Sequence, residues 1–244
     1  MTLKTETIAT VQALIEGASK TFANAEALYS EATILANCQA WARALVLYQI
    51  SSEECAKIEM LGATVTSLLM GHAVNVKSLR RAFGRHESKN KTNAYFLPRT
   101  EAETSALSAG DTLGVRKAFA GLQDAFHEES NFKKNAALYV DFGDTFRSPL
   151  EVVDEPVFQK VRAQNENFMA IAFAKVEMLR RWSIDLEGAA SQLAEFQDAL
   201  GTSALDSGNA KQIKAFHELL DKKLLVEKIR EFASKQRLPR SDHF

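Results

Sequence analysis

Apolar residues recur at steps of three and four positions over most of the chain, the spacing that places them on one face of an α-helix. Ala, Leu, Glu and Lys, which favour helices, dominate these stretches, and only four prolines interrupt the 244 residues. The pattern predicts helices over residues 5–36, 39–70, 76–88, 101–129, 153–199 and 208–236. We therefore expect an all-α fold.

Short breaks indicate how the predicted helices are connected. The first two are separated only near Asn37 to Gln39, so we expect them to form an antiparallel hairpin. The fifth is too long for an ordinary globular helix and is expected to bend near Gly188 or to project beyond the body. The segment AALYVDF, residues 136–142, predicts a short strand or an extended loop. There Tyr139 either covers a groove or, as we expect, packs against the core.

The composition is that of an ordinary globular protein. Hydrophobic residues make up 46% and charged residues 25%, enough for a sizeable core, and the net charge is -1. That balance gives no overall attraction to nucleic acid or membrane, so any such binding needs a local patch. The N-terminus lacks an apolar signal core, no stretch approaches the roughly 18 apolar residues of a membrane span, and the cysteines show no pairing pattern. We expect a cytoplasmic protein without a membrane segment.

A carboxylate lies on the apolar face of the second predicted helix. Glu54 follows the helical spacing of the apolar positions of that face, which are Leu47, Ile50, Ile58 and Leu61. A carboxylate buried there costs several kcal/mol unless a cation or a hydrogen-bond donor meets it. Two interpretations stay open: an ion pair with Lys57, three residues on, or a contact with an arginine or histidine of a neighbouring helix.

The sequence between Lys77 and Arg99 is strongly basic. It contains seven Lys or Arg residues against the single acid Glu87, which gives a local charge of +6 in a chain of net charge -1. Such a segment can bind phosphates, with an affinity that falls steeply as the salt concentration rises. By charge alone, a solvated helix end whose lysines and arginines face water is the more common case.

Two arginines and a histidine in this segment form a known motif. Arg80 and Arg81 precede His86 with five and four intervening residues, and Arg-x4-6-His after a helical hairpin is the signature of the HEPN superfamily. That superfamily consists of helical domains and includes many metal-independent ribonucleases. Either arginine satisfies the spacing. Arg80 is slightly favoured, because a polar residue tends to follow the arginine of the motif and Arg81 follows Arg80.

A wider pattern resembles one HEPN family, AbiV, whose members are abortive infection proteins. The family elements NA, RAL and EExxK are matched along the first two predicted helices by Asn24-Ala25, by Arg43-Ala44-Leu45, and by Glu53, Glu54 and Lys57. A His followed three residues later by Lys (FGRHESK), a Tyr-Val-Asp-Phe segment (NAALYVDF) and the pair Ser148-Pro149 are also similar. The resemblance extends over about residues 10 to 180.

The resemblance implies a fold, a reaction and partners. We expect residues 1–150 to form an HEPN-like antiparallel helical bundle, and residues 151–244 to form a long helical extension packed on it. HEPN ribonucleases usually dimerise, so that two Arg/His pairs face each other across one groove. The implied protein is therefore a homodimer that cleaves RNA in anti-phage defence, without a metal or other cofactor. A phage-encoded trigger or protein partner is also expected.

The resemblance implies residue roles as well. His86 would act as general base toward a ribose 2′-OH or as general acid toward the leaving 5′-oxygen. Arg80 or Arg81 would stabilise the charge on the scissile phosphate. Other residues would orient these groups or bind flanking phosphates: the orienting residues are Glu53, Glu54 and Lys57, and the phosphate-binding residues are Arg85, Lys89 and Lys91.

Two alternatives from other classes stay open. A catalytically silent HEPN-like module would bind RNA, the ribosome or a phage protein, and would need the arginines but not His86. A structural helical scaffold would use the basic segment as a dimer contact and would not bind RNA. The remaining histidines show no spacing of a di-iron or zinc site and indicate no further chemistry; they are His72, His127, His217 and His243.

Overall fold

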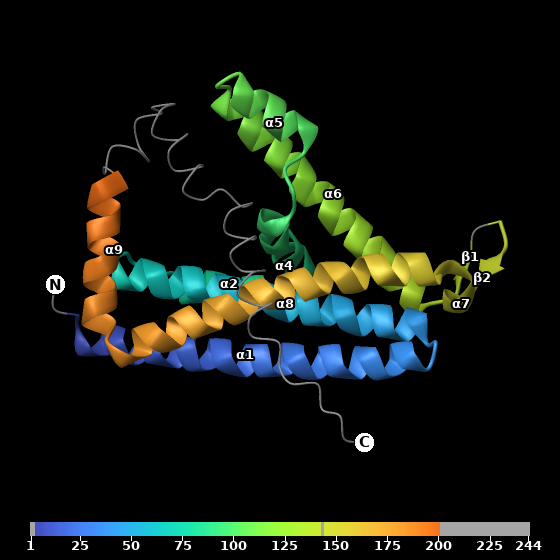
Figure 1. Ribbon diagram of the computed structural model, residues 1–244, viewed down its shortest axis with the longest axis horizontal. Coiled ribbons are helices and arrows are strands. Elements are labelled where there is room, and N and C mark those ends of the chain that lie inside the picture. Colours follow the sequence, from blue (N-terminus) through green and yellow to red (C-terminus); the bar gives the residue numbers. More distant parts are fainter. Residues whose placement is uncertain (1–2, 143, 201–244) are drawn as a thin grey trace.

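The computed structural model describes residues 3–142 and 144–200, and nearly all of this part is helical. Figure 1 shows a bundle of long helices from which a helical arm and a terminal helix project. The only strands in the described part are β1 (Asp141–Phe142) and β2 (Phe146–Arg147), so the predicted all-α fold is confirmed. The helix predicted over residues 208–236 lies outside the described residues.

α1 (Thr5–Asn37) and α2 (Trp41–Leu69) form the antiparallel hairpin that the sequence predicts, and they lie side by side along most of their length (Figure 1). The chain reverses at Gln39, which has a φ of 60°, the left-handed conformation that often follows a helix end. The Ala40 N–H donates to the Leu35 carbonyl at 2.9 Å and closes the turn. This hairpin is the platform on which the candidate site is built.

α8 (Glu155–Ile184) crosses the hairpin and closes the core (Figure 1). Asp154 caps its first turn by accepting a hydrogen bond from the Val157 N–H, and Pro156 suits that turn because its ring fixes a helical φ. Its buried apolar residues pack with those of α1 and α2 in two clusters: Phe158 and Val161 belong to one, and Phe168, Ala172, Val176 and Leu179 belong to the other.

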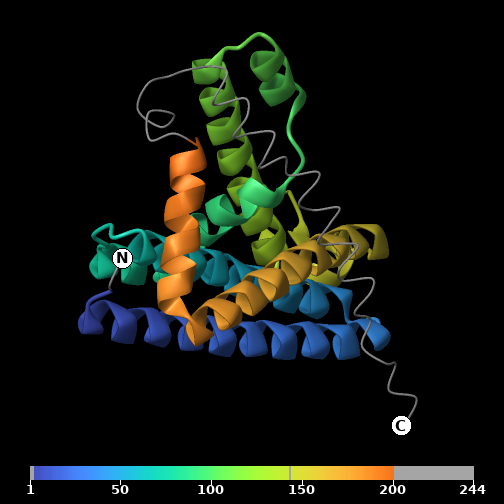
Figure 2. The ribbon, with the colours of Figure 1, turned by 60° about the vertical axis from the view of Figure 1, so that its left-hand side comes forward.

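The single helix predicted over residues 153–199 is divided in two by Asp185. α8 ends at Ile184, and α9 (Leu186–Leu200) leaves it at a steep angle, as Figures 1 and 2 show. The Asp185 carboxylate accepts a hydrogen bond from the Gly188 N–H at 2.8 Å and so caps α9. The bend expected near Gly188 therefore lies at Asp185, three residues earlier, where a capping side chain rather than a glycine begins the new helix, and α9 projects from the bundle.

The prediction of one helix over residues 76–88 is wrong, because the chain forms α3 (Val76–Gly84) and α4 (His86–Asn93). Arg85 between them is extended, with a φ of -103° and a ψ of 119°. Leu79 and Phe83 of α3 pack against the core, whereas α4 turns polar side chains toward α2. The break makes His86 the first residue of α4. A 3-10 helix, η1 (Ala94–Phe96), follows.

The helix predicted over residues 101–129 also consists of two, α5 (Glu101–Ser108) and α6 (Thr112–Leu138). Gly110 between them has a φ of 68°, a conformation that glycine adopts without strain. The pair forms the arm that projects from the bundle in Figures 1 and 2. The C-terminal half of α6, which extends nine residues beyond the predicted end at residue 129, returns to α2.

Residues 136–142, expected to form a short strand or an extended loop, contain only the two-residue strand β1. The first three end α6, and β1 then pairs with β2 so that Asp141 lies opposite Arg147. The expectation that Tyr139 packs against the core is wrong, because its side chain lies beyond the last turn of α6 and is 63% exposed. A single helical turn, α7 (Pro149–Val152), connects the β1–β2 strand pair to α8.

Candidate active site

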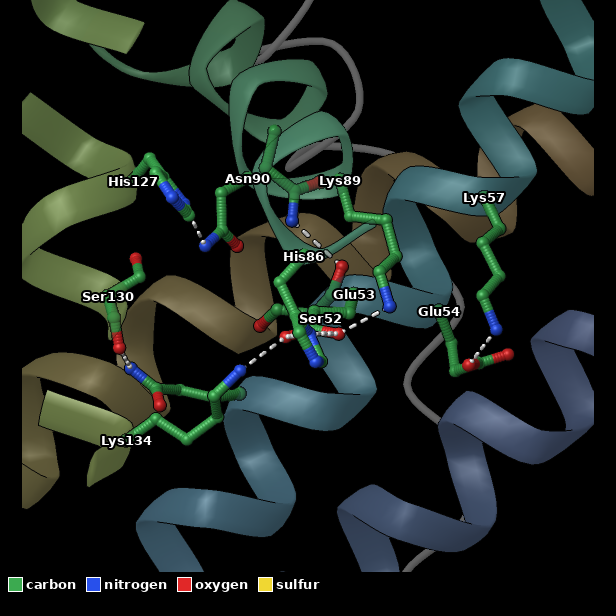
Figure 3. Close-up of polar contacts among 12 residues, drawn as sticks. Ser52, Glu53, Glu54, Lys57, His86, Lys89, Asn90, His127, Ser130 and Lys134 are labelled. Carbon is green, nitrogen blue, oxygen red and sulfur yellow. Dashed lines mark hydrogen bonds and ion pairs between the residues drawn. The ribbon is translucent and has the colours of Figure 1, made fainter. Parts of the chain in front are cut away.

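The buried carboxylate of Glu53 is the centre of the candidate active site, which Figure 3 shows. Glu53 lies in the middle of α2 and is only 4% exposed. Three side chains from α4 and α6 approach its two oxygens. Lys89 Nζ lies 2.6 Å from Oε2, His86 Nδ1 lies 2.7 Å from each oxygen, and Lys134 Nζ lies 3.3 Å from Oε1. These donors provide the compensation that a buried carboxylate requires.

The same donors keep Glu53 ionised. Burial, the largest single influence, would raise the pKa of Glu53. The hydrogen bond from Lys89, the charges of Lys134 and Lys89, and the hydrogen bond from His86 together outweigh burial and lower this pKa below its usual value. An ionised carboxylate can only accept hydrogen bonds. Nδ1 of His86 therefore carries the hydrogen in this contact, and Nε2 is the nitrogen that can exchange a proton.

His86 stands at the boundary between this buried cluster and the solvent. It is the first residue of α4, and its side chain is 56% exposed. The first backbone N–H groups of a helix have no partner within the helix, and the helix dipole favours an anion near them. An imidazole with one nitrogen fixed and the other accessible at a helix start is suited to proton transfer beside a phosphate.

α4 turns one polar face toward the rest of the site. By helical spacing, the residues of this face are His86, Lys89, Asn90 and Asn93. Asn93 donates to the backbone carbonyl of Ser52 at 2.8 Å, and the Asn90 amide donates to Nδ1 of His127 at 3.3 Å. These contacts join α4 to α2 on one side and to α6 on the other, so the position of His86 is fixed by three helices.

A matching polar stripe runs along α6 and consists, at helical spacing, of Gln123, His127, Ser130 and Lys134. Gln123 donates to the Lys91 carbonyl at 2.9 Å, and the Ser130 carbonyl accepts from Gln49 of α2 at 3.1 Å. Lys134 was not predicted as a site residue, and His127, which was expected to have no role, contacts Asn90 of the site. Lys134 lies beyond the predicted helix end at residue 129, and the regular spacing of the stripe was the signal that would have revealed it.

A small cavity lies between these helices beside Glu53. Its volume is about 20 Å³, which gives room for one water molecule. Side chains of α2, α4, α6 and α8 line it, among them Glu53, Lys134 and Gln49. The Oε1 atom of Gln49 is a buried acceptor without a hydrogen-bond partner in the described part of the chain. Because of its small volume, the cavity has no room for a molecule larger than water.

Glu54 and Lys57 form a separate pair on the adjacent side of α2. Lys57 Nζ contacts Glu54 Oε1 and lies 5.9 Å from the ring centroid of Phe83. Of the two interpretations of Glu54, the ion pair within the helix is thus the observed one. Its neighbour Glu53 is the carboxylate that reaches a histidine on another helix. The Lys57–Phe83 contact also joins α2 to the end of α3.

The arginines of the motif are exposed on α3. Arg80 and Arg81 form no hydrogen bond or ion pair with any residue in the ranges that the structure describes. Within one chain, neither guanidinium is in hydrogen-bonding contact with His86. Arg85, which precedes His86 directly, is exposed as well. The site of a single chain thus presents its imidazole and its arginines as separate exposed groups.

The two lysines expected to bind phosphates are both paired with carboxylates. The Lys89 side chain is 8% exposed and is held by Glu53. Lys91 lies 2.8 Å from Asp124 and 2.9 Å from Glu87, and the hydrogen bonds with these two acids raise the pKa of Lys91 to about 12. The structure therefore brings Glu53, His86 and Lys89 together and leaves Lys91 outside their cluster.

Residues 3–142 and 144–200 contain no group of three or more His, Cys, Asp or Glu side chains arranged to hold a metal ion. None of the helices in these ranges combines the length and the apolar character needed to cross a membrane.

The long helical hairpin followed by an Arg/His segment has the features of an HEPN domain. The family model described as AbiV, an HEPN family, matches residues 13–170, and the chain therefore belongs to the AbiV family. A curated relative, the uncharacterized protein y4gJ of Sinorhizobium fredii (strain NBRC 101917 / NGR234), is 38% identical over 107 residues. The match covers 43% of this chain and 56% of the relative, so the chain spans little more than half of its length. No solved structure matches the chain significantly.

Proposed function

We propose that this AbiV-family protein is a metal-independent endoribonuclease that arrests growth or translation in phage-infected cells. The observation that carries the proposal is the contact between Glu53 and Nδ1 of His86, which leaves Nε2 available for proton transfer. Membership of the AbiV family supports the link with abortive infection and with HEPN ribonucleases.

The proposed reaction is an internal transesterification of RNA. Nε2 of His86 accepts the proton of a ribose 2′-OH, the 2′-oxygen attacks the adjacent phosphorus, and the P–O5′ bond breaks. The products are a 2′,3′-cyclic phosphate and a 5′-hydroxyl, whose oxygen takes up one proton. In a homodimer whose two sites share one groove, the two copies of His86 act as base and acid.

The basic residues around His86 bind and stabilise the phosphate in this proposal. Arg80 or Arg81 stabilises the charge that builds on the phosphate oxygens, because a guanidinium offers two donors in one plane. Both side chains are exposed, which makes them accessible to RNA. Arg85 and the first turn of α4 bind flanking phosphates, and Lys91 adds its charge at the edge of the site.

The remaining residues position these groups. Glu53 and Lys89 orient the imidazole from the protein interior. The pair of Glu54 and Lys57 supports the end of α3, the helix that carries the arginines, through the contact of Lys57 with Phe83.

A silent RNA-binding module is the second candidate, because neither Arg80 nor Arg81 contacts His86 within the described part of one chain. In that case the exposed arginines bind RNA, cleavage does not occur, and His86 is dispensable. The protein then acts by sequestering RNA or the ribosome.

One comparison separates these functions. Purified wild type, His86→Ala and His72→Ala are incubated with total cellular RNA in EDTA at low and moderate salt, and binding is measured on the same samples. His72 is the matched control because it is exposed and lies before α3, outside the cluster. Fragments with cyclic phosphate ends from wild type and His72→Ala, but not from His86→Ala, support the nuclease. Binding without cleavage by any of the three favours the silent module, and neither binding nor cleavage favours a scaffold.

A further inference from the structure

We propose that Lys134 of α6 is a positioning residue for His86: it anchors the Glu53 carboxylate from a third helix and thereby fixes which imidazole nitrogen carries the hydrogen. The kinetic part of this role rests on the proposed ribonuclease function, whereas its effect on the His86 tautomer does not. The residues concerned are drawn in Figure 3, where Lys134 approaches Glu53 from the side opposite to Lys89.

The three donors to Glu53 are not equivalent. His86 and Lys89 belong to α4 and are three residues apart, so any shift of α4 moves both together. Lys134 belongs to α6 and contacts Oε1, whereas Lys89 contacts Oε2. Glu53 is therefore held at both oxygens by cations from two separate helices. Without Lys134, Oε1 keeps only His86 as a donor, and the carboxylate loses its contact with α6.

The exposure of Lys134 argues against a direct contact with RNA. Its side chain is 12% exposed, close to the 8% of Lys89 and far from the 56% of His86. The positive charge of the Lys134 ammonium favours the ionised form of the buried Glu53 carboxylate. In that form the carboxylate accepts the Nδ1 hydrogen of His86. Loss of the Lys134 charge favours rotation or protonation of Glu53, and either change releases the imidazole to the other tautomer.

The residue directly before Lys134 provides a matched control. Lys133 is on the same helix and its side chain is 18% exposed, but it pairs with Glu129 of α6 instead of Glu53. Substitution of Lys133 removes the same charge and a similar apolar stem without touching Glu53. Effects of overall charge or of helix α6 stability then appear in both variants, whereas an effect on His86 appears only with Lys134.

The test uses the full chain labelled with ¹⁵N in its histidines, of which there are five. Ring ¹⁵N shifts, read near neutral pH, report which nitrogen is protonated. We expect His86 to carry its hydrogen on Nδ1 in wild type, Lys133→Met and Lys134→Arg, and to shift toward the Nε2–H tautomer in Lys134→Met. For RNA cleavage we expect Lys134→Met to lower kcat roughly 10- to 100-fold with little change in KM. Lys134→Arg should keep most of the wild-type kcat.

The tautomer readout also separates failure of this role from failure of the ribonuclease function. If wild type cleaves no RNA, the nuclease proposal fails. The ring ¹⁵N shifts still show whether Lys134 controls the tautomer of His86. An unchanged His86 tautomer in a folded Lys134→Met overturns the positioning role. A raised KM at constant kcat also overturns it, because Lys134 then contacts RNA directly. If Lys134→Met does not fold, Lys134→Gln, which keeps a donor but not the charge, takes its place with the same expected shift.

Discussion

The Nδ1 atom of His86 lies 2.7 Å from a carboxylate oxygen of Glu53, a residue 33 positions earlier in the chain. The contact joins the first residue of α4 to the middle of α2. Glu53 is buried and His86 is half exposed, so the carboxylate holds the ring from inside while Nε2 remains accessible. A carboxylate that fixes the tautomer and orientation of a histidine in this way is a recurring feature of sites that transfer protons.

Glu53 should also be a major determinant of stability. Glu53→Gln leaves Lys89 and Lys134 without a counter-charge in a buried position, and we expect the free energy of unfolding to fall by about 3 kcal/mol. Glu54→Gln, on the same helix, breaks only the single ion pair with Lys57, which is less buried, and should cost less than Glu53→Gln. Urea denaturation of both variants at pH 7 checks this, and equal losses would contradict a special role for Glu53.

The lowered pKa of Glu53 predicts a particular response to acid. Because the pKa of Glu53 is lower in the folded than in the unfolded state, its ionisation stabilises the fold at pH values above the unfolded pKa, near 4.5. That contribution is lost as the pH falls through the folded-state pKa. Urea midpoints measured between pH 7 and pH 3 should therefore fall less steeply for Glu53→Gln than for wild type. Parallel curves would show that the pKa of Glu53 is the same in the folded and the unfolded protein.

Substitution of the two motif arginines should change different kinetic quantities. We expect Arg80→Ala to lower kcat for RNA cleavage about 100-fold or more, as loss of a donor to transition-state charge does, and Arg81→Ala mainly to weaken binding. Arg116→Ala, an exposed arginine on the arm, is the control and should change neither value. Single-turnover cleavage with a defined RNA measures both effects. The reverse order would assign the motif role to Arg81.

Periodicity predicted the helical framework because the long helices bury apolar faces. The α1–α2 hairpin and its turn follow directly from the spacing of apolar residues. The errors fall where backbone conformation or a cap overrides that spacing. Arg85 is extended, Gly110 is left-handed, and Asp185 caps α9, and none of these breaks interrupts the apolar pattern.

The candidate site was predictable in part. The Arg/His motif indicated His86, EExxK indicated Glu53, and the His followed three residues later by Lys indicated Lys89, there as a phosphate-binding residue. The fold brings these three together, with Lys89 paired to Glu53. Of the two interpretations left open for Glu54, the ion pair with Lys57 is observed, and it is Glu53 that contacts a histidine of another helix. On α2, a shift of one position turns a side chain by about 100°. Lys134 was missed because it lies beyond the predicted helix end, on a polar stripe that the apolar spacing does not reveal. His127 lies within the predicted helix, but its spacing to other residues gave no sign of its contact with Asn90.

Lys91 should bind RNA better when one of its two acidic partners is replaced by a neutral residue. In the folded chain, Asp124 and Glu87 both pair with Lys91, so part of its charge is neutralised. We expect Asp124→Asn to lower the Kd for single-stranded RNA roughly two- to threefold at low salt and to steepen its salt dependence. Fluorescence anisotropy over a salt series measures both. Glu128→Gln, which removes an exposed acid elsewhere on α6, controls for the change in net charge.

Asn165 should connect the stability of the core to the geometry of the site. It is fully buried on α8, and its amide donates to the Tyr48 carbonyl and to Ser52 Oγ, each at 3.0 Å. Ser52 directly precedes Glu53, so Asn165 holds the turn of α2 from which the carboxylate projects. We expect Asn165→Ala to lower the free energy of unfolding by about 1–3 kcal/mol, because it leaves a cavity and removes two hydrogen bonds.

The same substitution should also reduce cleavage, because a looser turn at Ser52 loosens the contact between Glu53 and His86. The exposed Gln159→Ala on the same helix is the control and should alter neither stability nor activity. Urea denaturation, together with His86 ring ¹⁵N shifts under conditions where both variants are fully folded, measures the two effects separately. A destabilised Asn165→Ala with an unchanged His86 tautomer would show that α8 supports the core without helping to position the site.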